Sequence, residues 1–338
     1  MKVKIKKYMA IFTAACLFLM TGCGNGTING YVEETFSGAD LAMDTVISAS
    51  FTSKEGLDPK ETFDKIVDNC KKLDENVLSR YVEDSEISRI NLSAGSKEGY
   101  ALSEKTEEYI SKCLEISKAT DGTFDITLGA VIDLWDIEGA IKEDTEFRVP
   151  ADDEIKAALD KCGYEKVKIN DHKIYIPEGM ILDLGAVGKG IFLDEITPIK
   201  QEISRGTLTA GGSVYCMGQK PTGEAWVIGI KNPFDTSESM INVSVSPDSV
   251  VSTSGDYERY IESDGIRYHH IIDRNTGYPA GGGLSSVTVI MPCGNGLVSD
   301  ALSTAVFILG EGSAQELADK YGAQIIMITT DGDIIKTN

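Results

Sequence analysis

The arrangement of hydrophobic periodicities along this chain constrains its fold more than any other feature. Before residue 163, apolar residues recur at three- and four-residue intervals, which is the spacing of amphipathic helices. After residue 163, short alternating and β-branched stretches predominate, and these are typical of strands. Because the helical and strand patterns do not alternate regularly, we expect an α+β fold rather than a βαβ array.

The expected helices have recognisable ends. Ser103 is suited to cap a helix that Asp121-Gly122 would end, and Gly163 is placed to end another. We expect helices within residues 59–77, 103–120, 152–162, 189–204, 299–309 and 312–321. We expect strands near residues 166–170, 173–176, 180–184, 225–230, 240–246, 257–261, 266–272, 285–291 and 323–329. No internal repeat and no boundary after residue 40 is visible, so we expect one domain over residues 41–338.

The N-terminus has the composition of an export signal. Four lysines precede an apolar run over residues 9–20, which is too short to span a bilayer comfortably. The run ends in Met20-Thr21-Gly22-Cys23, which resembles the bacterial lipoprotein box, whose cysteine is acylated. We therefore expect a signal peptide at residues 1–22 and a palmitate-bearing anchor at Cys23. The domain would then face the extracytoplasmic side of the cell membrane, and an ordinary signal cleaved nearby is the alternative.

The segment that follows Cys23 has no hydrophobic periodicity. It is rich in Gly, Asn and Thr, which favours a flexible tether over residues 23–40 between the anchor and the domain. Five scattered cysteines remain after Cys23, and they form no Cys-x-x-Cys pair. A disulfide framework or a zinc site is therefore not expected, and we interpret these residues as buried thiols.

The charge of the chain limits its possible ligands. Asp and Glu number 53 and Lys and Arg number 32, which gives a formal charge of −21. Removal of residues 1–22 would leave 28 basic residues and a charge of −25. This balance argues against a protein that binds nucleic acid by broad phosphate neutralisation. An anionic ligand would need cations placed locally.

A glycine-rich segment is one candidate site. Residues 181–190 read as an apolar strand followed by three glycines and the start of a helix, with Lys189 beside the turn. Free backbone amides and a lysine suit a phosphate group. The spacing matches neither a P-loop nor a Rossmann fingerprint, so an ordinary tight turn remains the alternative.

A second candidate lies on a late helix. Asp300 and Thr304 are four residues apart, so their oxygens lie on one helix face and could bind one Mg²⁺. The alternative is that Asp300 favours the helix N-terminus and Thr304 bonds back to the backbone.

Two further polar segments are the remaining candidate sites. His269 and His270 are adjacent in an expected strand, so their side chains face opposite ways and at most one is catalytic. With three histidines in the chain, a histidine-rich metal site is excluded. Residues 121–127 form a polar loop, for which a turn around a buried Phe124 is the alternative.

Taken in order, these segments carry a family resemblance over residues 41–335. The matching motifs include Met43-Asp44-Thr45, Ser79-Arg80-Tyr81, residues 84–91, Gly122-Thr123-Phe124-Asp125, Trp135, residues 183–190, Gly211-Gly212, residues 226–233, Thr253-Ser254-Gly255-Asp256-Tyr257, His270-Ile271-Ile272-Asp273, Thr276-Gly277 and residues 300–304. Together they resemble the bacterial FAD:protein FMN transferases, the ApbE-like flavin transferases. Two positions depart from the family pattern, since Asp44 replaces the usual glycine and Arg274 the common proline.

The resemblance implies a T-fold-like arrangement of largely antiparallel sheets packed with helices, with FAD in a cleft between two halves. It implies one Mg²⁺ bound by the carbonyl of Ala186, by Asp300 and by Thr304. It implies that His270 or Asp183 is the general base. It also implies an FAD site formed by Met43, Tyr81, Thr123, Phe124, Asp125, Asp183, Lys189 and Ile272.

The implied activity is Mg²⁺-dependent transfer of FMN from FAD to a Thr or Ser hydroxyl of an acceptor protein, with release of AMP. The chain lacks the family's acceptor motif, so the acceptor would be another protein. Expected partners are exported or membrane-bound subunits of Rnf-type or sodium-pumping quinone reductase complexes, or extracellular flavoproteins. Two alternatives are an Mg²⁺-dependent FAD pyrophosphatase that yields FMN and AMP, and a non-catalytic flavin-binding lipoprotein. A solute-binding lipoprotein would favour two βαβ lobes, which the strand-rich second half does not suggest.

Overall fold

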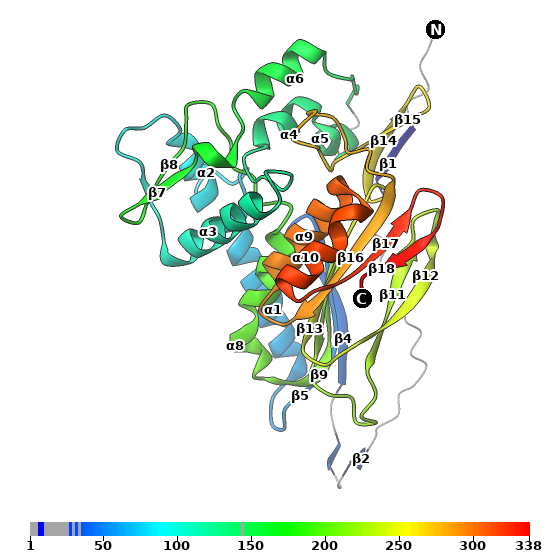
Figure 1. Ribbon diagram of the computed structural model, residues 1–338. Helices are drawn as coiled ribbons and strands as arrows, with labels where there is room; N and C mark the ends of the chain where they lie inside the picture. Colours follow the sequence, from blue (N-terminus) through cyan, green and yellow to red (C-terminus); the bar gives the residue numbers. More distant parts are fainter. Residues whose placement is uncertain (1–5, 10–26, 29–30, 33–34, 143–144) are drawn as a thin grey trace.

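A computed structural model describes residues 6–9, 27–28, 31–32, 35–142 and 145–338 (Figure 1). Cys23 and most of the expected signal peptide and tether therefore lie outside the described residues. Within the described part, one antiparallel sheet has the strand order β18-β17-β16-β13-β10-β9-β5-β4. Its strands are β4 (Thr35–Ala42), β5 (Thr45–Ser53), β9 (Ile203–Ala210), β10 (Ser213–Met217), β13 (Ser249–Gly255), β16 (Leu284–Pro292), β17 (Gln324–Thr329) and β18 (Ile334–Lys336).

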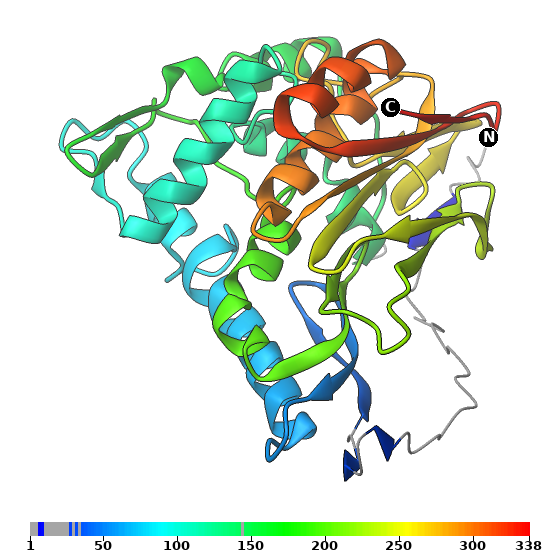
Figure 2. The same cartoon turned by 60° about the horizontal axis from the view of Figure 1, so that its bottom comes forward.

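The two faces of this sheet are covered by different layers. Helices pack on one face, and the hairpin of β11 (Trp226–Asn232) and β12 (Asp235–Val245) packs on the other (Figures 1 and 2). Neighbouring strand residues point to opposite faces, so Val250 joins the helix-side core while Val251 packs beneath the hairpin. The helices of this half are α1 (Pro59–Leu73), α2 (Glu86–Leu92), α3 (Glu104–Ala119), α7 (Gly188–Glu195), α8 (Thr197–Lys200), α9 (Gly296–Leu309) and α10 (Ala314–Tyr321).

A second, smaller apolar cluster is centred on Trp135. Its ring contacts Phe147, Tyr268 and Tyr278, with centroid distances of 5.4–6.4 Å. The cluster is formed by α4 (Gly129–Trp135), α5 (Ile137–Lys142), α6 (Asp152–Leu159), β14 (Arg259–Ser263) and β15 (Ile266–His269). Short elements complete the described fold: β1 (Lys6–Met9), which pairs with β14, β2 (Thr27–Ile28), β3 (Tyr31–Val32), a π-helix (Asp74–Leu78), β6 (Tyr100–Ala101), 3-10 turns (Tyr164–Lys166 and Glu311–Ser313), β7 (Lys168–Asn170) and β8 (Lys173–Tyr175).

The predicted α+β class with largely antiparallel sheets is confirmed, and several predicted ends agree with the structure. The side chain of Ser103 accepts a hydrogen bond from the amide of Thr106 and caps α3. Cys70, Cys113, Cys162 and Cys216 are buried free thiols, as expected, whereas Cys293 is half-buried. Among the described helices, none combines the length and the apolar character needed to cross a bilayer.

Three expectations about the elements were wrong. Residues 180–184 form no strand, because Ile181 makes only an isolated bridge with Leu128. Helix α9 begins at Gly296, before the expected start at residue 299. The expected tether boundary at residue 40 falls inside β4, which pairs with β5 from Thr35 onward. Gly38 and four serines in these strands hide the alternation of apolar side chains that marks a strand.

Two glycines bring the N-termini of α7 and α9 into backbone contact. A Cβ atom on Gly190 would lie 2.1 Å from the carbonyl oxygen of Gly296, and one on Gly296 would lie 2.3 Å from that of Gly190. No other residue type fits at either position without moving a helix. This close approach places the glycine-rich segment against the helix that carries Asp300 and Thr304.

Gly190→Ala should therefore destabilise the fold. Because the added methyl group meets backbone rather than a flexible side chain, we expect the free energy of unfolding to fall by about 3 kcal/mol. Urea unfolding followed by circular dichroism measures this loss. Gly312→Ala is the matched control, since a Cβ there meets no atom within 4 Å. Equal stability of the two variants would contradict the tight contact.

Candidate active site

Asp300 joins two segments that are more than a hundred residues apart. It lies in the second turn of α9 and is 4% exposed. Its Oδ2 accepts a hydrogen bond of 2.7 Å from the amide of Gly190, and its Oδ1 accepts one of 2.9 Å from the hydroxyl of Ser213. Each oxygen therefore has one protein donor and keeps lone-pair capacity for a further ligand. The alternative role for Asp300, at the helix N-terminus, is excluded because α9 begins four residues earlier.

Ala186 lies one turn before Gly190 in the glycine-rich segment. In a regular helix the Gly190 amide would bond to the carbonyl of Ala186. Here that amide donates to Asp300 instead, and α7 begins only at Gly188. The Ala186 carbonyl is therefore not committed to that helical bond, and the residue is exposed. Ala186 therefore lies one turn before the residue whose amide Asp300 accepts from.

Thr304 lies one turn after Asp300 on α9. Its Oγ1 is 3.3 Å from the Oγ of Ser254, which is also 2.7 Å from the Oγ of Ser303. The three expected metal ligands therefore supply a carbonyl, a carboxylate and a hydroxyl at the junction of α7, α9 and the central sheet. The described residues contain no group of three or more His, Cys, Asp and Glu side chains that could hold a metal.

Asp194 organises the start of α9 from the last turn of α7. Its Oδ1 accepts from the amide of Gly296 at 2.8 Å, and its Oδ2 accepts from the amide of Leu297 at 3.1 Å. Burial and the nearby carboxylate of Asp300 together raise the pKa of Asp194 to about 6, although these hydrogen bonds act in the opposite direction. The two neighbouring acids favour a cation at this junction.

Met43 packs against the glycine-rich segment, which includes Lys189. Met43 is in the turn between β4 and β5 with a φ of 51°, and its methyl group lies 3.1 Å from the position of a Cβ on Gly188. The side chain of Lys189 passes 3.4 Å from the position of a Cβ on Gly211. Lys189 is half-buried. Both residues therefore lie at the segment that meets Asp300.

Asp183 is paired rather than free. Its Oδ2 lies 2.7 Å from Nε of Arg80, and its Oδ1 accepts a hydrogen bond of 2.7 Å from the amide of Gly185. Arg80 also forms a 2.6 Å ion pair with Asp133, and its guanidinium lies 4.4 Å from the ring centre of Tyr81. The ring of Tyr81 is exposed. This network holds Asp183 and Tyr81 in fixed positions at one edge of the site.

The 121–127 loop is anchored through Asp125. Its buried carboxylate accepts bonds from the amide and hydroxyl of Thr127 and from the amide of Tyr164. Arg274 lies 3.3 Å from its Oδ2 and also pairs with Glu165. Burial raises the pKa of Asp125, although these bonds act in the opposite direction. Phe124 and Thr123 are also buried, so the turn around a buried Phe124 is present.

The two histidines face different surroundings, as expected from their adjacency. His269 is buried, with Nδ1 accepting from the amide of Ile271 and Nε2 bonded to the carbonyl of Ala280 at 2.9 Å. Burial lowers its pKa to about 4. Both of its nitrogens are used, so His269 is structural.

One ring nitrogen of His270, Nε2, is available as a hydrogen-bond acceptor. Its Nδ1 lies 3.3 Å from the carbonyl oxygen of Arg259, which can only accept a hydrogen bond. Nδ1 therefore carries the proton and Nε2 keeps its lone pair. Burial, together with the positive charge of Arg259, lowers the pKa of His270 to about 3. His270 is thus a neutral imidazole with a free acceptor nitrogen.

A hydrogen bond from His270 to the backbone of Arg259, followed by a chain of ion pairs, connects His270 to the turn that contains Met43. Arg259 pairs with Glu138 of α5, and Lys142 lies 3.8 Å from Glu138 and 2.9 Å from Asp44. Asp44, one of the two departures from the family pattern, therefore has an ion-pair partner.

Our predicted site residues did not include Arg80, Ser213, Asp194, Glu138 and Arg259, because each acts through a partner that is distant in the chain.

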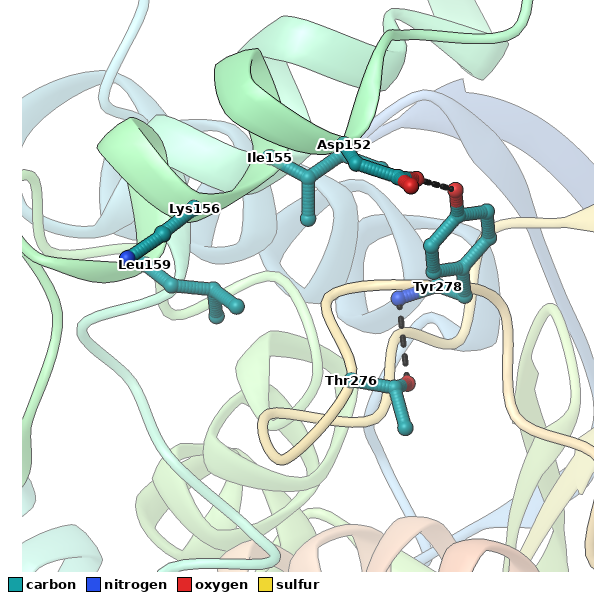
Figure 3. Close-up of a pocket in the computed structure, with 6 residues that line it drawn as sticks. All are labelled: Asp152, Ile155, Lys156, Leu159, Thr276 and Tyr278. Atoms are coloured by element: carbon teal, nitrogen blue, oxygen red, sulfur yellow. Dashed lines mark hydrogen bonds between the residues drawn. The ribbon is translucent and has the colours of Figure 1, made fainter.

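Ile272 is 5% exposed and forms an isolated bridge with Pro279. The loop that follows packs on α6, where a pocket of about 440 Å³ is lined by Asp152, Ile155, Lys156, Leu159, Thr276 and Tyr278 (Figure 3). The Tyr278 hydroxyl donates to Asp152 at 2.6 Å, and the Tyr278 amide donates to the hydroxyl of Thr276. None of our predicted site residues lines this pocket.

Comparisons with known proteins agree with the resemblance. The model of the ApbE family matches residues 43–328. The FAD:protein FMN transferase of Escherichia coli (strain K12) is 33% identical over 271 residues, covering 78% of this chain and 76% of that protein.

Solved structures are similar over most of the chain. The crystal structure of the ApbE protein from Thermotoga maritima has a TM-score of 0.80 and 31% identity, covering 90% of this chain and 97% of that one. The flavin transferase ApbE from Vibrio cholerae has a TM-score of 0.77 and 28% identity, covering 90% and 98%.

Proposed function

This chain belongs to the ApbE family and is an enzyme that transfers FMN from FAD to an acceptor protein; from this premise we propose the residues that perform the transfer. Asp300, with Thr304 and the carbonyl of Ala186, would hold Mg²⁺. His270 would act as general base, and Lys189 would bind phosphate. The observation that carries the proposal is the contact between the Asp300 carboxylate and the glycine-rich segment.

The donor set fits Mg²⁺ better than a softer metal. It offers one carboxylate, one hydroxyl and one carbonyl, and Mg²⁺ prefers oxygen ligands while keeping several waters. Asp300 is buried there and Asp194 is half-buried. When bound, the metal would neutralise negative charge on the pyrophosphate oxygens. With a net charge of −21, the protein needs such local positive charge.

The FAD site would lie between the two apolar clusters. Met43, Tyr81, Thr123, Phe124, Asp125, Asp183, Lys189 and Ile272 are our proposed contacts. Support comes from their connections, since the amide of Asp183 donates to the carbonyl of Ile126 and Arg274 links Asp125 to the segment after Ile272. Because the carboxylates of Asp183 and Asp125 are already engaged, we assign them to binding and positioning.

The proton would pass to His270. The acceptor's Thr or Ser hydroxyl must lose its proton as its oxygen attacks the FMN phosphorus, and AMP is the leaving group. His270 is neutral and has Nε2 free to accept that proton. Asp183 is less suited as the base because it is ion-paired with Arg80.

Hydrolysis of FAD is the second candidate reaction. Water would replace the protein hydroxyl at the same site, giving FMN and AMP, and a binding protein without turnover would release neither. One experiment separates these cases. The soluble domain is mixed with FAD, Mg²⁺ and a candidate acceptor, then run on a denaturing gel for flavin fluorescence. A fluorescent acceptor band supports transfer, whereas AMP without that band supports pyrophosphatase activity. If neither a labelled acceptor nor AMP forms, both proposed reactions are contradicted.

We also propose an exported, lipid-anchored protein. The basic and apolar leader and the Met20-Thr21-Gly22-Cys23 segment support a signal peptide and acylation at Cys23. The acceptors would then be exported or membrane-bound flavoproteins, such as Rnf-type or sodium-pumping quinone reductase subunits. Mass spectrometry of the mature N-terminus tests this, since an unmodified Cys23 preceded by residues 1–22 would contradict it.

Lys189→Ala should weaken FAD binding more than it affects folding. A hydrogen bond to a charged group contributes about 1.5–3 kcal/mol, so we expect a dissociation constant roughly 10- to 100-fold higher. Titration of FAD by flavin fluorescence in Mg²⁺ measures the change. Lys168→Ala, in the exposed strand β7, is the matched control. If Lys189→Ala binds FAD as the control does, Lys189 does not contact the phosphates.

A further inference from the structure

A row of serine hydroxyls faces α9 from the central sheet. Ser213 of β10 and Ser252 of β13 are direct partners in the antiparallel ladder. Ser252 and Ser254 share a face with Val250, which belongs to the helix-side core. The three hydroxyls therefore lie on the side of the sheet that α9 covers.

Two of these serines contact the proposed metal ligands. Ser213 donates to Oδ1 of Asp300 at 2.9 Å, and Ser254 lies 3.3 Å from the hydroxyl of Thr304. Ser213 thus fixes the carboxylate, whose other oxygen is fixed by the amide of Gly190. Two of the three serines therefore each contact one proposed ligand.

Ser252 is the exception within the row. Its side chain is 0% exposed, and its Oγ has no hydrogen-bond partner among the described residues. Buried hydroxyls normally have a partner, which is either protein or ordered water. Because directly opposed strand residues have Cβ atoms about 5 Å apart, Ser252 lies beside the serine that holds Asp300.

We propose that Ser213, Ser252 and Ser254 are positioning residues for the Mg²⁺ site, and that Ser252 completes its hydrogen bonding with a water of the metal's hydration shell. This proposal rests on the Mg²⁺ site of the proposed function. Mg²⁺ keeps several of its waters when it binds to proteins, so a polar partner for one of them is needed. A buried hydroxyl beside the only carboxylate ligand meets that need.

Ser252→Ala distinguishes this role from a structural one. If Ser252 lacks a partner until the metal binds, its loss leaves the melting temperature of the metal-free protein equal to or above that of the wild type. The Mg²⁺ dissociation constant of Ser252→Ala should rise about tenfold, since residues that hydrogen-bond to metal ligands typically contribute 10- to 100-fold in metal affinity. Ser213→Ala should raise that constant by about 10- to 100-fold, because Asp300 loses a fixed donor.

Ser53→Ala is the matched control. Ser53 of β5 is also a buried serine whose Oγ has no partner among the described residues. It pairs with Ile203, whereas Ser213 pairs with Ala210, seven residues further along β9. At about 3.3 Å per residue, the control lies roughly 23 Å from the serine row along the strand. Its Mg²⁺ dissociation constant should equal that of the wild type.

Calorimetric titration of Mg²⁺ into the metal-free protein, with thermal unfolding of the same samples, gives both readouts. Tenfold weaker binding by Ser252→Ala without loss of metal-free stability supports the proposal. Wild-type binding by Ser252→Ala overturns it, as does a large fall in its metal-free melting temperature. If the wild-type protein itself binds no Mg²⁺, the proposed metal site fails instead, and Asp300→Asn tests that site separately.

Discussion

Asp300→Asn should nearly abolish Mg²⁺-dependent FMN transfer while leaving the protein folded. Asn keeps the size of Asp, and its oxygen can still accept from the Gly190 amide. Its NH₂ group can donate to Ser213, whose hydroxyl is able to rotate and accept. The fold is therefore preserved and the negative charge is lost.

The expected loss of rate is large because the charge acts directly on the metal. A metal ion contributes several kcal/mol of transition-state stabilisation, so we expect turnover to fall on the order of a thousandfold at limiting Mg²⁺. Rates of acceptor labelling, measured against Mg²⁺ concentration, check this. Asp68→Asn, which changes an exposed carboxylate of α1, is the matched control. Transfer by Asp300→Asn at the wild-type rate would show that the metal is bound elsewhere.

The part of the fold that was predicted correctly has strong local periodicity. The apolar stripe of α1 and the capped α3 follow from residues within one helix. The strands β9, β10 and β13 were missed. Their sequences contain Thr, Ser and Gly at inward positions such as Ser213 and Ser252, so they lack the alternation of apolar residues that marks a strand.

The start of α9 could not be predicted for a related reason. No side chain caps the helix at Asn295. Instead Asp194 accepts from the first amides of α9, and it comes from α7, about a hundred residues earlier. Likewise the pairing of Asp183 with Arg80 depends on the tertiary fold. The sequence therefore indicated Asp183 and Asp300, and the structure adds Arg80, Gly190 and Ser213 as the residues that hold them.

His270→Asn should reduce turnover without weakening FAD binding. The Asn amide can replace Nδ1 as the donor to the carbonyl of Arg259, so local structure is kept. The acceptor nitrogen Nε2 is lost. General base catalysis typically contributes 10²- to 10⁴-fold, and we expect a fall in kcat within that range. Initial rates of acceptor labelling and FAD titrations on the same variant separate the two effects.

Two comparisons identify the base. His269→Gln is the matched control, because His269 bonds to Ala280 and should affect stability rather than turnover of the folded protein. Asp183→Asn tests the rival base. If Asp183→Asn loses turnover with unchanged FAD affinity while His270→Asn stays active, the assignment reverses.

The pH dependence gives an independent test of His270. A base must be unprotonated to act, so activity falls as the pH drops through its pKa. Burial, with the charge of Arg259, lowers the pKa of His270 to about 3, well below the ordinary value for histidine. His270 should therefore contribute no fall in rate between pH 7 and about pH 5, over which circular dichroism confirms the fold; a fall near pH 6 that persists in His270→Asn would come from Asp194 instead. An acidic limb near pH 6.5 that is absent in His270→Asn would show instead that His270 titrates as an ordinary, solvated histidine during turnover.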